Sequence, residues 1–413
     1  MFRNYFIVFF VFLFNHVLSQ HVDIPWPEVK DSSNLVDTHS KAVQYQAKGI
    51  FKFDEIGVGI RNDFPGARLN DVSLINDSTL QVLIRPENFP INISPWYAFK
   101  IWSENPDIFY IRFNYEQGMH RYSPKLSSDG LVWEQIHSEN VLISNNDSSA
   151  FFRVHVTPDT LWFSAQELMC TDYIRQWENE LLQKPFVNDH LIGHSTNGRQ
   201  LKALTMAAGH DKNLLIILSR QHPPELTGFM EMMRFVETLA GDKRIAKRFR
   251  KKFEVIIMPL MNPDGVENGH WRHNAGGVDL NRDWRYFNQP ETFALRKFVL
   301  QEIKKRHLEI RYAIDFHSTQ TDIFYTPDPS TLASGTGITN SWVQAINKKY
   351  PNNQFSPEPS GVEGQFSKNW FLHELKTEAI TYEVGDSTDR DVIQKRGETS
   401  AIKLMRILLK KYR

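Results

Sequence analysis

The chain has 413 residues, with 48 Lys and Arg side chains balanced by 48 Asp and Glu side chains. This length exceeds what a single hydrophobic core usually holds, so we expect two domains. The balanced charge gives no electrostatic footprint for a nucleic acid, which argues against nucleic acid as a partner. Because Cys170 is the single cysteine, an intrachain disulfide or a thiolate zinc site is excluded, and a metal site must use His and carboxylate ligands.

Residues 1–19 have the pattern of a secretory signal peptide. Arg3 precedes an apolar run over residues 5–14 that is too short to span a bilayer, and small residues precede a cleavage point near Ser19. The alternative is a retained membrane anchor. We expect the mature protein to be secreted or periplasmic, with no membrane contact after cleavage.

Residues 20–165 are predicted to form an antiparallel β-sandwich. Short runs with a period of two or with many aromatic residues are separated by clusters of Gly, Pro, Asn and Asp. The runs cover residues 79–86, 96–103, 108–115 and 150–157.

Residues 166–413 are predicted to form an α/β domain with a mostly parallel or mixed sheet covered by helices. Apolar runs of strand length alternate with stretches of helical period, which is typical of this architecture. The strand-like runs cover residues 213–219, 253–260, 311–317 and 378–385, and the helical stretches cover 225–241, 292–306, 339–350 and 400–413.

Four ionisable residues fall at the carboxyl ends of the predicted strands, where ligand sites form in open α/β sheets. His222 follows the first strand, Pro223–Pro224 are expected in the first turn of the next helix, and Glu225 follows. His317 and Glu383 end two later strands. Each residue alone is weak evidence, but two His and one Glu are a ligand set of hydrolytic zinc sites, and the second Glu is then available as a general base.

Residues 261–284 form a motif that is specific to one protein family, "MNPDGVENGHWRHNAGGVDLNRDW". Together with "HPPE", "DFHS" and "TYEVG", this segment resembles the zinc carboxypeptidase family, the M14 metallopeptidases. Within that family the chain resembles the cytosolic-carboxypeptidase-like branch, which carries a β-sandwich ahead of the catalytic domain. The segments "WYAFKIWS" and "HRYSPKLSSDGLVWEQI" are similar to that sandwich.

The resemblance implies a role for each motif residue. It makes His222, Glu225 and His317 the ligands of one Zn²⁺ and Glu383 the catalytic base. It makes Asp279 the residue that accepts a hydrogen bond from the first ligand His and so fixes its tautomer.

Three further residues are implied to contact the substrate. Asn281 and Arg282 match the pair that binds the terminal carboxylate, for which a planar guanidinium is suited. Arg272 matches the residue that stabilises the developing oxyanion. The implied reaction is hydrolysis of the last bond of a peptide or protein, which releases its C-terminal residue.

Lys368 is the candidate residue for selecting which C-terminal residue of the substrate is released. An ungapped alignment on Trp370 and Glu383 puts Lys368 where the family reads the side chain of the leaving residue. A cation there would favour C-terminal Glu or Asp. The alternative is a solvated surface lysine displaced by a local gap.

The sequence also departs from the family pattern at two positions. Gly361 stands at the ungapped position where many relatives carry a mobile, substrate-capping Tyr. Pro224 replaces an Arg of digestive relatives, so one contact with the peptide is missing.

Two other functions remain open from the sequence. One is a zinc amidase or deacylase of small acyl-amino acids, and the other is a non-catalytic peptide-binding module. The presence of Arg272 together with Asn281 and Arg282 favours peptide hydrolysis over the first. The filled metal and base positions favour it over the second.

Overall fold

The computed structural model describes residues 41–413 except 145–148, 327–336, 353 and 361–363. The predicted signal peptide and Gly361 therefore lie outside the described residues. Within these described ranges, no helix has both the length and the apolar character needed to cross a membrane.

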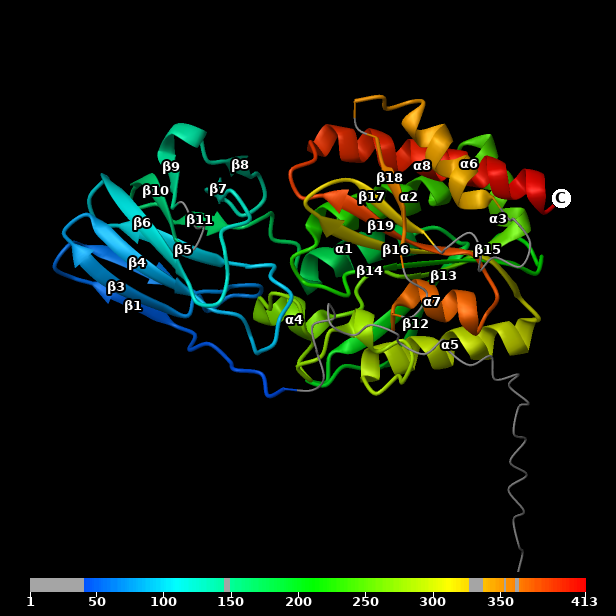
Figure 1. Ribbon diagram of the computed structural model, residues 1–413, viewed down its shortest axis with the longest axis horizontal. Helices are drawn as coiled ribbons and strands as arrows, with labels where there is room; N and C mark the ends of the chain where they lie inside the picture. Colours follow the sequence, from blue (N-terminus) through cyan, green and yellow to red (C-terminus); the bar gives the residue numbers. More distant parts are fainter. Residues whose placement is uncertain (1–40, 145–148, 327–336, 353, 361–363) are drawn as a thin grey trace, which may run out of the picture.

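The N-terminal part of the chain forms two facing sheets, drawn in blue to green in Figure 1. One sheet has the strand order β1-β2-β5-β11-β7-β8 and the other β3-β4-β6-β10-β9. All strand pairs within them are antiparallel except β4 with β6. The strands are β1 (Ile50–Phe53), β2 (Val58–Arg61), β3 (Asp71–Asn76), β4 (Thr79–Ile84), β5 (Ala98–Ser103), β6 (Asp107–Tyr115), β7 (Lys125–Ser127), β8 (Glu134–Gln135), β9 (Val141–Ile143), β10 (Ser149–Val156) and β11 (Leu161–Ser164), with the 3₁₀ helix η1 (Ser138–Asn140) before β9.

Alternation of side chains explains why these segments pair as a sandwich. In β4, Leu80, Val82 and Ile84 are fully buried, while the residues between them are half-buried. Because successive strand residues point to opposite faces, this pattern places one apolar face toward the opposing sheet. The core between the sheets is rich in aromatic rings, among which Phe99 and Phe163 stack with ring centroids 5.0 Å apart.

The C-terminal part is built on one mixed sheet of eight strands, in the order β12-β13-β15-β14-β16-β19-β17-β18. Its centre is parallel, because β15, β14, β16 and β19 pair in the same direction. The strands are β12 (Val187–His194), β13 (Gln200–Met206), β14 (Asn213–Ser219), β15 (Phe253–Met258), β16 (Glu309–Thr319), β17 (Ile323–Thr326), β18 (Ser356–Pro359) and β19 (Ala379–Gly385).

Helices cover both faces of this sheet (Figure 1). One apolar core joins the sheet to α1, α2, α3, α6 and α8, and a second joins it to α5 and α7. The helices are α1 (Thr171–Leu182), α2 (Leu226–Ala240), α3 (Arg244–Lys252), α4 (Pro263–Asn268), η2 (Leu280–Arg282), α5 (Pro290–Arg306), α6 (Ile338–Asn347), α7 (Ser367–His373) and α8 (Arg390–Lys411). The predicted fold class is confirmed, whereas the division of the chain at residue 165 stays a prediction.

Several boundaries differ from those expected. Pro223–Pro224 form a turn before α2 instead of its first turn, because a proline disfavours helical backbone in the residue before it. The turn closes with a hydrogen bond from Glu225 N to His222 O (3.4 Å), which brings these two residues side by side. The α1 helix and the β12–β13 hairpin were not predicted, and α8 begins ten residues earlier than expected, at Arg390.

Candidate metal centre and active site

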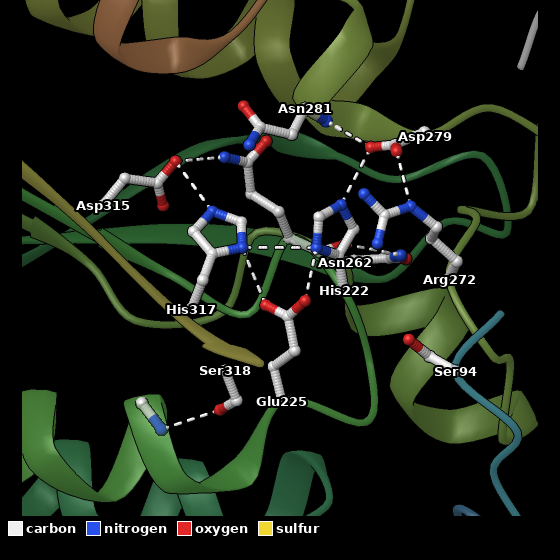
Figure 2. A network of polar contacts seen from close by, with 12 residues as sticks. Ser94, His222, Glu225, Asn262, Arg272, Asp279, Asn281, Asp315, His317 and Ser318 are labelled. Carbon is white, nitrogen blue, oxygen red and sulfur yellow. Dashed lines mark hydrogen bonds and ion pairs between the residues drawn. The ribbon is translucent and has the colours of Figure 1, made fainter. Parts of the chain in front are cut away.

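His222, Glu225 and His317 meet at the carboxyl edge of the parallel strands. His222 follows β14, Glu225 directly precedes α2, and His317 lies in the neighbouring strand β16. The two oxygens of Glu225 lie 2.7 Å from His222 Nδ1 and 2.7 Å from His317 Nδ1. The two Nδ1 atoms are 3.2 Å apart. Figure 2 shows the three side chains converging on one point.

This arrangement fits a zinc ion. Two ring nitrogens and a carboxylate are zinc donors, and three protein ligands leave a coordination position open. All three side chains are buried, and their donor atoms lie within 4.8 Å of one another. Although burial opposes ionisation of Glu225, the His222 and His317 rings hold the pKa of its carboxyl below the ordinary value.

A carboxylate stands behind each of the two His rings. His222 Nε2 lies 2.8 Å from Asp279 Oδ1, and His317 Nε2 lies 3.0 Å from Asp315 Oδ2. A carboxylate that accepts the far N–H of an imidazole directs its other nitrogen toward the metal. Asp279 therefore lies behind His222, in contact with its Nε2 atom (Figure 2).

Asp315 was not among the predicted site residues. Its position in "DFH" nevertheless carries a signal, because residues two apart in a strand point to the same face. Gln221 and Ser367 donate to the same Asp315 oxygen that faces His317, and Gln221 in turn accepts from Trp284 Nε1 (2.9 Å). Asp315, whose carboxylate faces His317 Nε2, is thus held in place by a chain of buried hydrogen bonds.

Glu383 lies on β19, paired in register with His317 on β16. Both residues line a cavity of about 300 Å³. One carboxylate oxygen of Glu383, Oε2, is buried without a hydrogen-bond partner, and burial raises the pKa of this carboxyl above its ordinary value. An unpartnered carboxylate that faces a cavity beside the ligand set is available to take a proton from a bound molecule.

The basic residues predicted to bind substrate line the same cavity. Arg272 Nε donates to Asp279 Oδ2 (2.6 Å), so one carboxylate holds both a ligand His and this guanidinium. Arg282 lies over the ring of Phe366, with its guanidinium carbon 4.5 Å from the ring centroid. Asn281 Oδ1 accepts from Ser367 N (2.9 Å) and so ties η2 to the start of α7.

Lys368 is buried, with 2% of its surface exposed. This contradicts the alternative of a solvated surface lysine. Its Nζ donates to Asn369 Oδ1 (2.8 Å) and lies 3.4 Å from Ser360 O, and no carboxylate of the described residues lies within 4.0 Å of it. Burial lowers the pKa of Lys368 to about 7. Lys368 also lines the cavity, whereas contact with the side chain of the leaving residue stays a prediction.

The cavity includes residues that the sequence analysis missed. Asn92, Ser94 and Arg121 come from the β-sandwich and line the same cavity as the His222–Glu225–His317 set. Arg121 Nε and one terminal nitrogen lie 2.8 Å from Asp386 Oδ2, which follows β19. Alternation of apolar and polar residues identified the sandwich strands. It does not indicate which loops of the sandwich contact the α/β domain.

Comparison with known proteins decides the family. A model of the family described as "Zinc carboxypeptidase" matches residues 174–390, which is more than half of the chain. The chain belongs to the zinc carboxypeptidase family. The resemblance drawn from the motifs is thereby confirmed, and zinc is the metal expected at the His222–Glu225–His317 set.

Curated relatives within this zinc carboxypeptidase family are distant. Cytosolic carboxypeptidase 3 of Mus musculus is 23% identical over 309 residues, which are 67% of this chain and 31% of that protein. Cytosolic carboxypeptidase 6 of Caenorhabditis elegans is 25% identical over 283 residues, which are 62% of this chain and 61% of that protein. The chain thus spans less than two thirds of the length of these curated relatives.

Solved structures show the same fold over both parts of the chain. The metallo-carboxypeptidase from Burkholderia cenocepacia has a TM-score of 0.74 and 17% identity, and the match covers 86% of this chain and 100% of that chain. A metallo-carboxypeptidase from Pseudomonas aeruginosa, solved with (2-guanidinoethylmercapto)succinic acid, has a TM-score of 0.71 and 19% identity, with coverage of 86% and 100%. The β-sandwich ahead of the catalytic domain is therefore part of a known arrangement.

Proposed function

We propose that this protein is a zinc metallocarboxypeptidase that releases the C-terminal residue of a peptide or protein. One observation carries this proposal: a single cavity holds the His222–Glu225–His317 set together with Glu383, Arg272, Arg282 and Asn281. The set would hold a zinc ion, Glu383 supplies a base, and the cations supply sites for negative charge. Binding alone does not require an unpartnered carboxylate beside a metal site.

Hydrolysis requires an activated carbonyl and water, which zinc would supply, and a group that transfers protons, which is Glu383. Zinc held by such a set would act as a Lewis acid on the scissile carbonyl and would lower the pKa of water toward about 7. Glu383 takes a proton from the attacking water and delivers it to the nitrogen of the leaving residue. Burial raises the pKa of Glu383 and so favours the first of these transfers, because a carboxylate with a raised pKa is a stronger base.

Arg272 is positioned for the charge that develops on the carbonyl oxygen. Its guanidinium lies in the cavity and is fixed by Asp279, so it need not reorganise during the reaction. Fixed donors in a site that excludes water stabilise such a charge strongly. We assign this role to Arg272.

Asn281 and Arg282 are assigned to the terminal carboxylate of the substrate. Arg282 Nη1 lies 3.8 Å from Asp279 Oδ2, a long contact that leaves the guanidinium available to a second carboxylate. Anchoring the free carboxylate here would place the last peptide bond beside Glu383. Misplacement of a bound substrate by about 1 Å can cost about 10²-fold in rate.

Lys368 is assigned to the side chain of the released residue. A buried ammonium without a counter-ion is costly, and a carboxylate of the substrate would complete the ion pair. The assignment therefore predicts a preference for C-terminal Glu or Asp.

Peptides in matched pairs test the proposed activity. A peptide with a free C-terminus should lose one residue in the presence of zinc, whereas the same peptide with a C-terminal amide should stay intact, as read by mass spectrometry. Glu383→Gln should abolish trimming, and the exposed Glu180→Gln on α1 should leave it unchanged. Trimming of the amide, or full activity of Glu383→Gln, would contradict the proposal. Activity on acyl-amino acids but not on peptides would indicate a deacylase instead.

We also propose that residues 1–19 direct secretion and are removed near Ser19. The support is the sequence pattern of this segment. The word "cytosolic" in the names of the curated relatives refers to those proteins. N-terminal sequencing of the protein recovered outside the cytoplasm tests the proposal: a start at Gln20 is expected, and an intact N-terminus on protein retained in the cell would contradict it.

A further inference from the structure

The loop that carries Arg272 is built against the β-sandwich. It covers residues 269–277, between α4 and η2. Trp271 is fully buried and belongs to the apolar core of the sandwich. A Cβ added to Gly118 of the sandwich would lie 2.7 Å from the Trp271 ring, so the absence of a side chain at Gly118 makes room for this ring.

Glu87 reaches from the sandwich into this loop and caps its backbone. One carboxylate oxygen accepts from Trp271 N (2.7 Å), and the other accepts from Arg272 N (2.9 Å) and His273 N (2.6 Å). Three successive backbone N–H groups thus point at one side chain that lies more than 180 residues earlier in the chain. Glu87 itself is fully buried.

Asn88 holds the same loop at two further points. Its side-chain nitrogen donates to Gly277 O (3.0 Å), and its side-chain oxygen contacts His273 Nδ1. Gly277 has a left-handed backbone, with φ of 76°, and a Cβ there would clash with Lys41 O at 1.9 Å. The loop therefore has little freedom to move relative to the sandwich.

The surroundings of Glu87 keep it ionised. Burial opposes ionisation, but the His270 and His273 rings, the Arg68 guanidinium and the backbone N–H of His273 together lower the pKa of Glu87 to about 2. A carboxylate has only acceptor sites, so it can satisfy all three N–H groups, whereas a glutamine amide would direct its own N–H toward at least one of them.

We propose that Glu87 is a positioning residue for catalysis: by capping the backbone N–H groups of residues 271–273, the sandwich sets the place of the Arg272 guanidinium in the active-site cavity. Glu87 fixes the backbone of Arg272, and Asp279 fixes its side chain. This inference rests on the proposed function, because it presumes that Arg272 acts on the substrate. It gives the sandwich a part in the reaction in addition to lining the cavity.

A double-mutant cycle tests the proposal in the zinc-loaded full chain. Arg272→Ala should lower kcat by about 10²- to 10³-fold, as removal of a donor to an oxyanion does. Glu87→Gln should lower kcat by about tenfold or more with a smaller change in KM, since a misplaced donor weakens the transition state. In the Arg272→Ala background, Glu87→Gln should have almost no further effect on kcat. Glu139→Gln, an exposed glutamate in η1, is the matched control.

Hydrogen exchange gives a readout that does not depend on activity. In the peptide that spans residues 269–277, the amides capped by Glu87 should exchange about tenfold faster or more in Glu87→Gln. Arg272→Ala and Glu139→Gln should leave this exchange unchanged, and zinc content should stay the same in all variants. If Glu87→Gln does not fold, Glu87→Asp, which keeps the charge but withdraws it by one methylene, is measured in the same way.

The outcomes separate the two proposals. Losses of kcat that multiply in the double variant, or unchanged exchange in residues 269–277, would overturn the role of Glu87 alone. A fully active Arg272→Ala would remove Arg272 from the proposed mechanism, and the catalytic role of Glu87 with it. Non-additive losses together with faster exchange would establish the positioning role.

Discussion

At the scale of single residues, Lys368 gives the most specific prediction about substrate choice. It is a buried cation without a carboxylate partner among the described residues. Arg282 lines the same cavity, and we assign both Lys368 and Arg282 to the C-terminal residue of the substrate. One suits the terminal carboxylate, and the other suits a side-chain carboxylate.

We predict that Lys368→Met removes the preference for acidic C-terminal residues. A hydrogen bond to a charged group contributes about 1.5–3 kcal/mol, so kcat/KM for C-terminal Glu should fall by about 10- to 100-fold relative to Leu. Peptides that differ only in their last residue provide the measurement, and exposed Lys395→Met on α8 is the control. Because Met has a similar length without the buried charge, the free energy of unfolding should not decrease. An unchanged ratio of Glu to Leu release would show that Lys368 does not contact the released side chain.

The pH dependence of this preference follows from the same residue. Burial lowers the pKa of Lys368 to about 7 in the free protein, so the side chain is cationic below this pH and neutral above it. The ratio of kcat/KM for C-terminal Glu over Leu should therefore decline as pH rises through about 7, since this constant reports groups of the free enzyme. The ratio should be flat with pH in Lys368→Met. A ratio that rises with pH in the native protein would contradict the assignment.

At the scale of elements, the close contact of α2 with β16 holds the ligand set together. Glu225 precedes α2 and His317 lies in β16, so their separation depends on how closely this helix approaches the strand. Gly228 makes the approach possible, because a Cβ there would lie 2.0 Å from His317 O. Its N–H donates to Ser318 Oγ (2.9 Å), which locks the helix to the strand.

We predict that Gly228→Ala is destabilising, although Ala is normally the better helix former by about 1 kcal/mol. The added methyl must push α2 away from β16, at a cost of roughly 1–3 kcal/mol. Zinc affinity should fall as well, because Glu225 moves with the helix. Thermal unfolding and zinc titration measure the two effects. Gly49→Ala, where an added Cβ meets no atom within 4 Å, serves as the comparison; equal stability of the two variants would contradict the packing argument.

At the scale of the whole molecule, the sequence predicted the features that depend on local pattern and missed those that depend on distant pairing. The position of the site at the carboxyl ends of β14, β16 and β19 was predictable. The apolar runs end near His222, His317 and Glu383, and parallel strands end at the same edge of a sheet. The strand β16 continues two residues past His317, beyond the predicted run of residues 311–317.

The contribution of the sandwich to the site was not predictable in this way. Glu87 contacts Arg272 across 185 residues, and Arg121 contacts Asp386 across 265 residues. Neither contact leaves a periodic signal, and single charged residues in loops are usually solvated. The family resemblance supplied the roles of Arg272, Asn281 and Arg282, for which composition and spacing gave no derivation.

The zinc content of the purified protein tests the central claim most directly, because every assigned role is arranged around the His222–Glu225–His317 set. Elemental analysis should find about one zinc per chain in the native protein and in Glu383→Gln, which keeps all three ligands. His317→Ala should hold little or none. Native protein that folds but binds no zinc on titration, or His317→Ala that binds it as tightly as the native protein, would contradict the account.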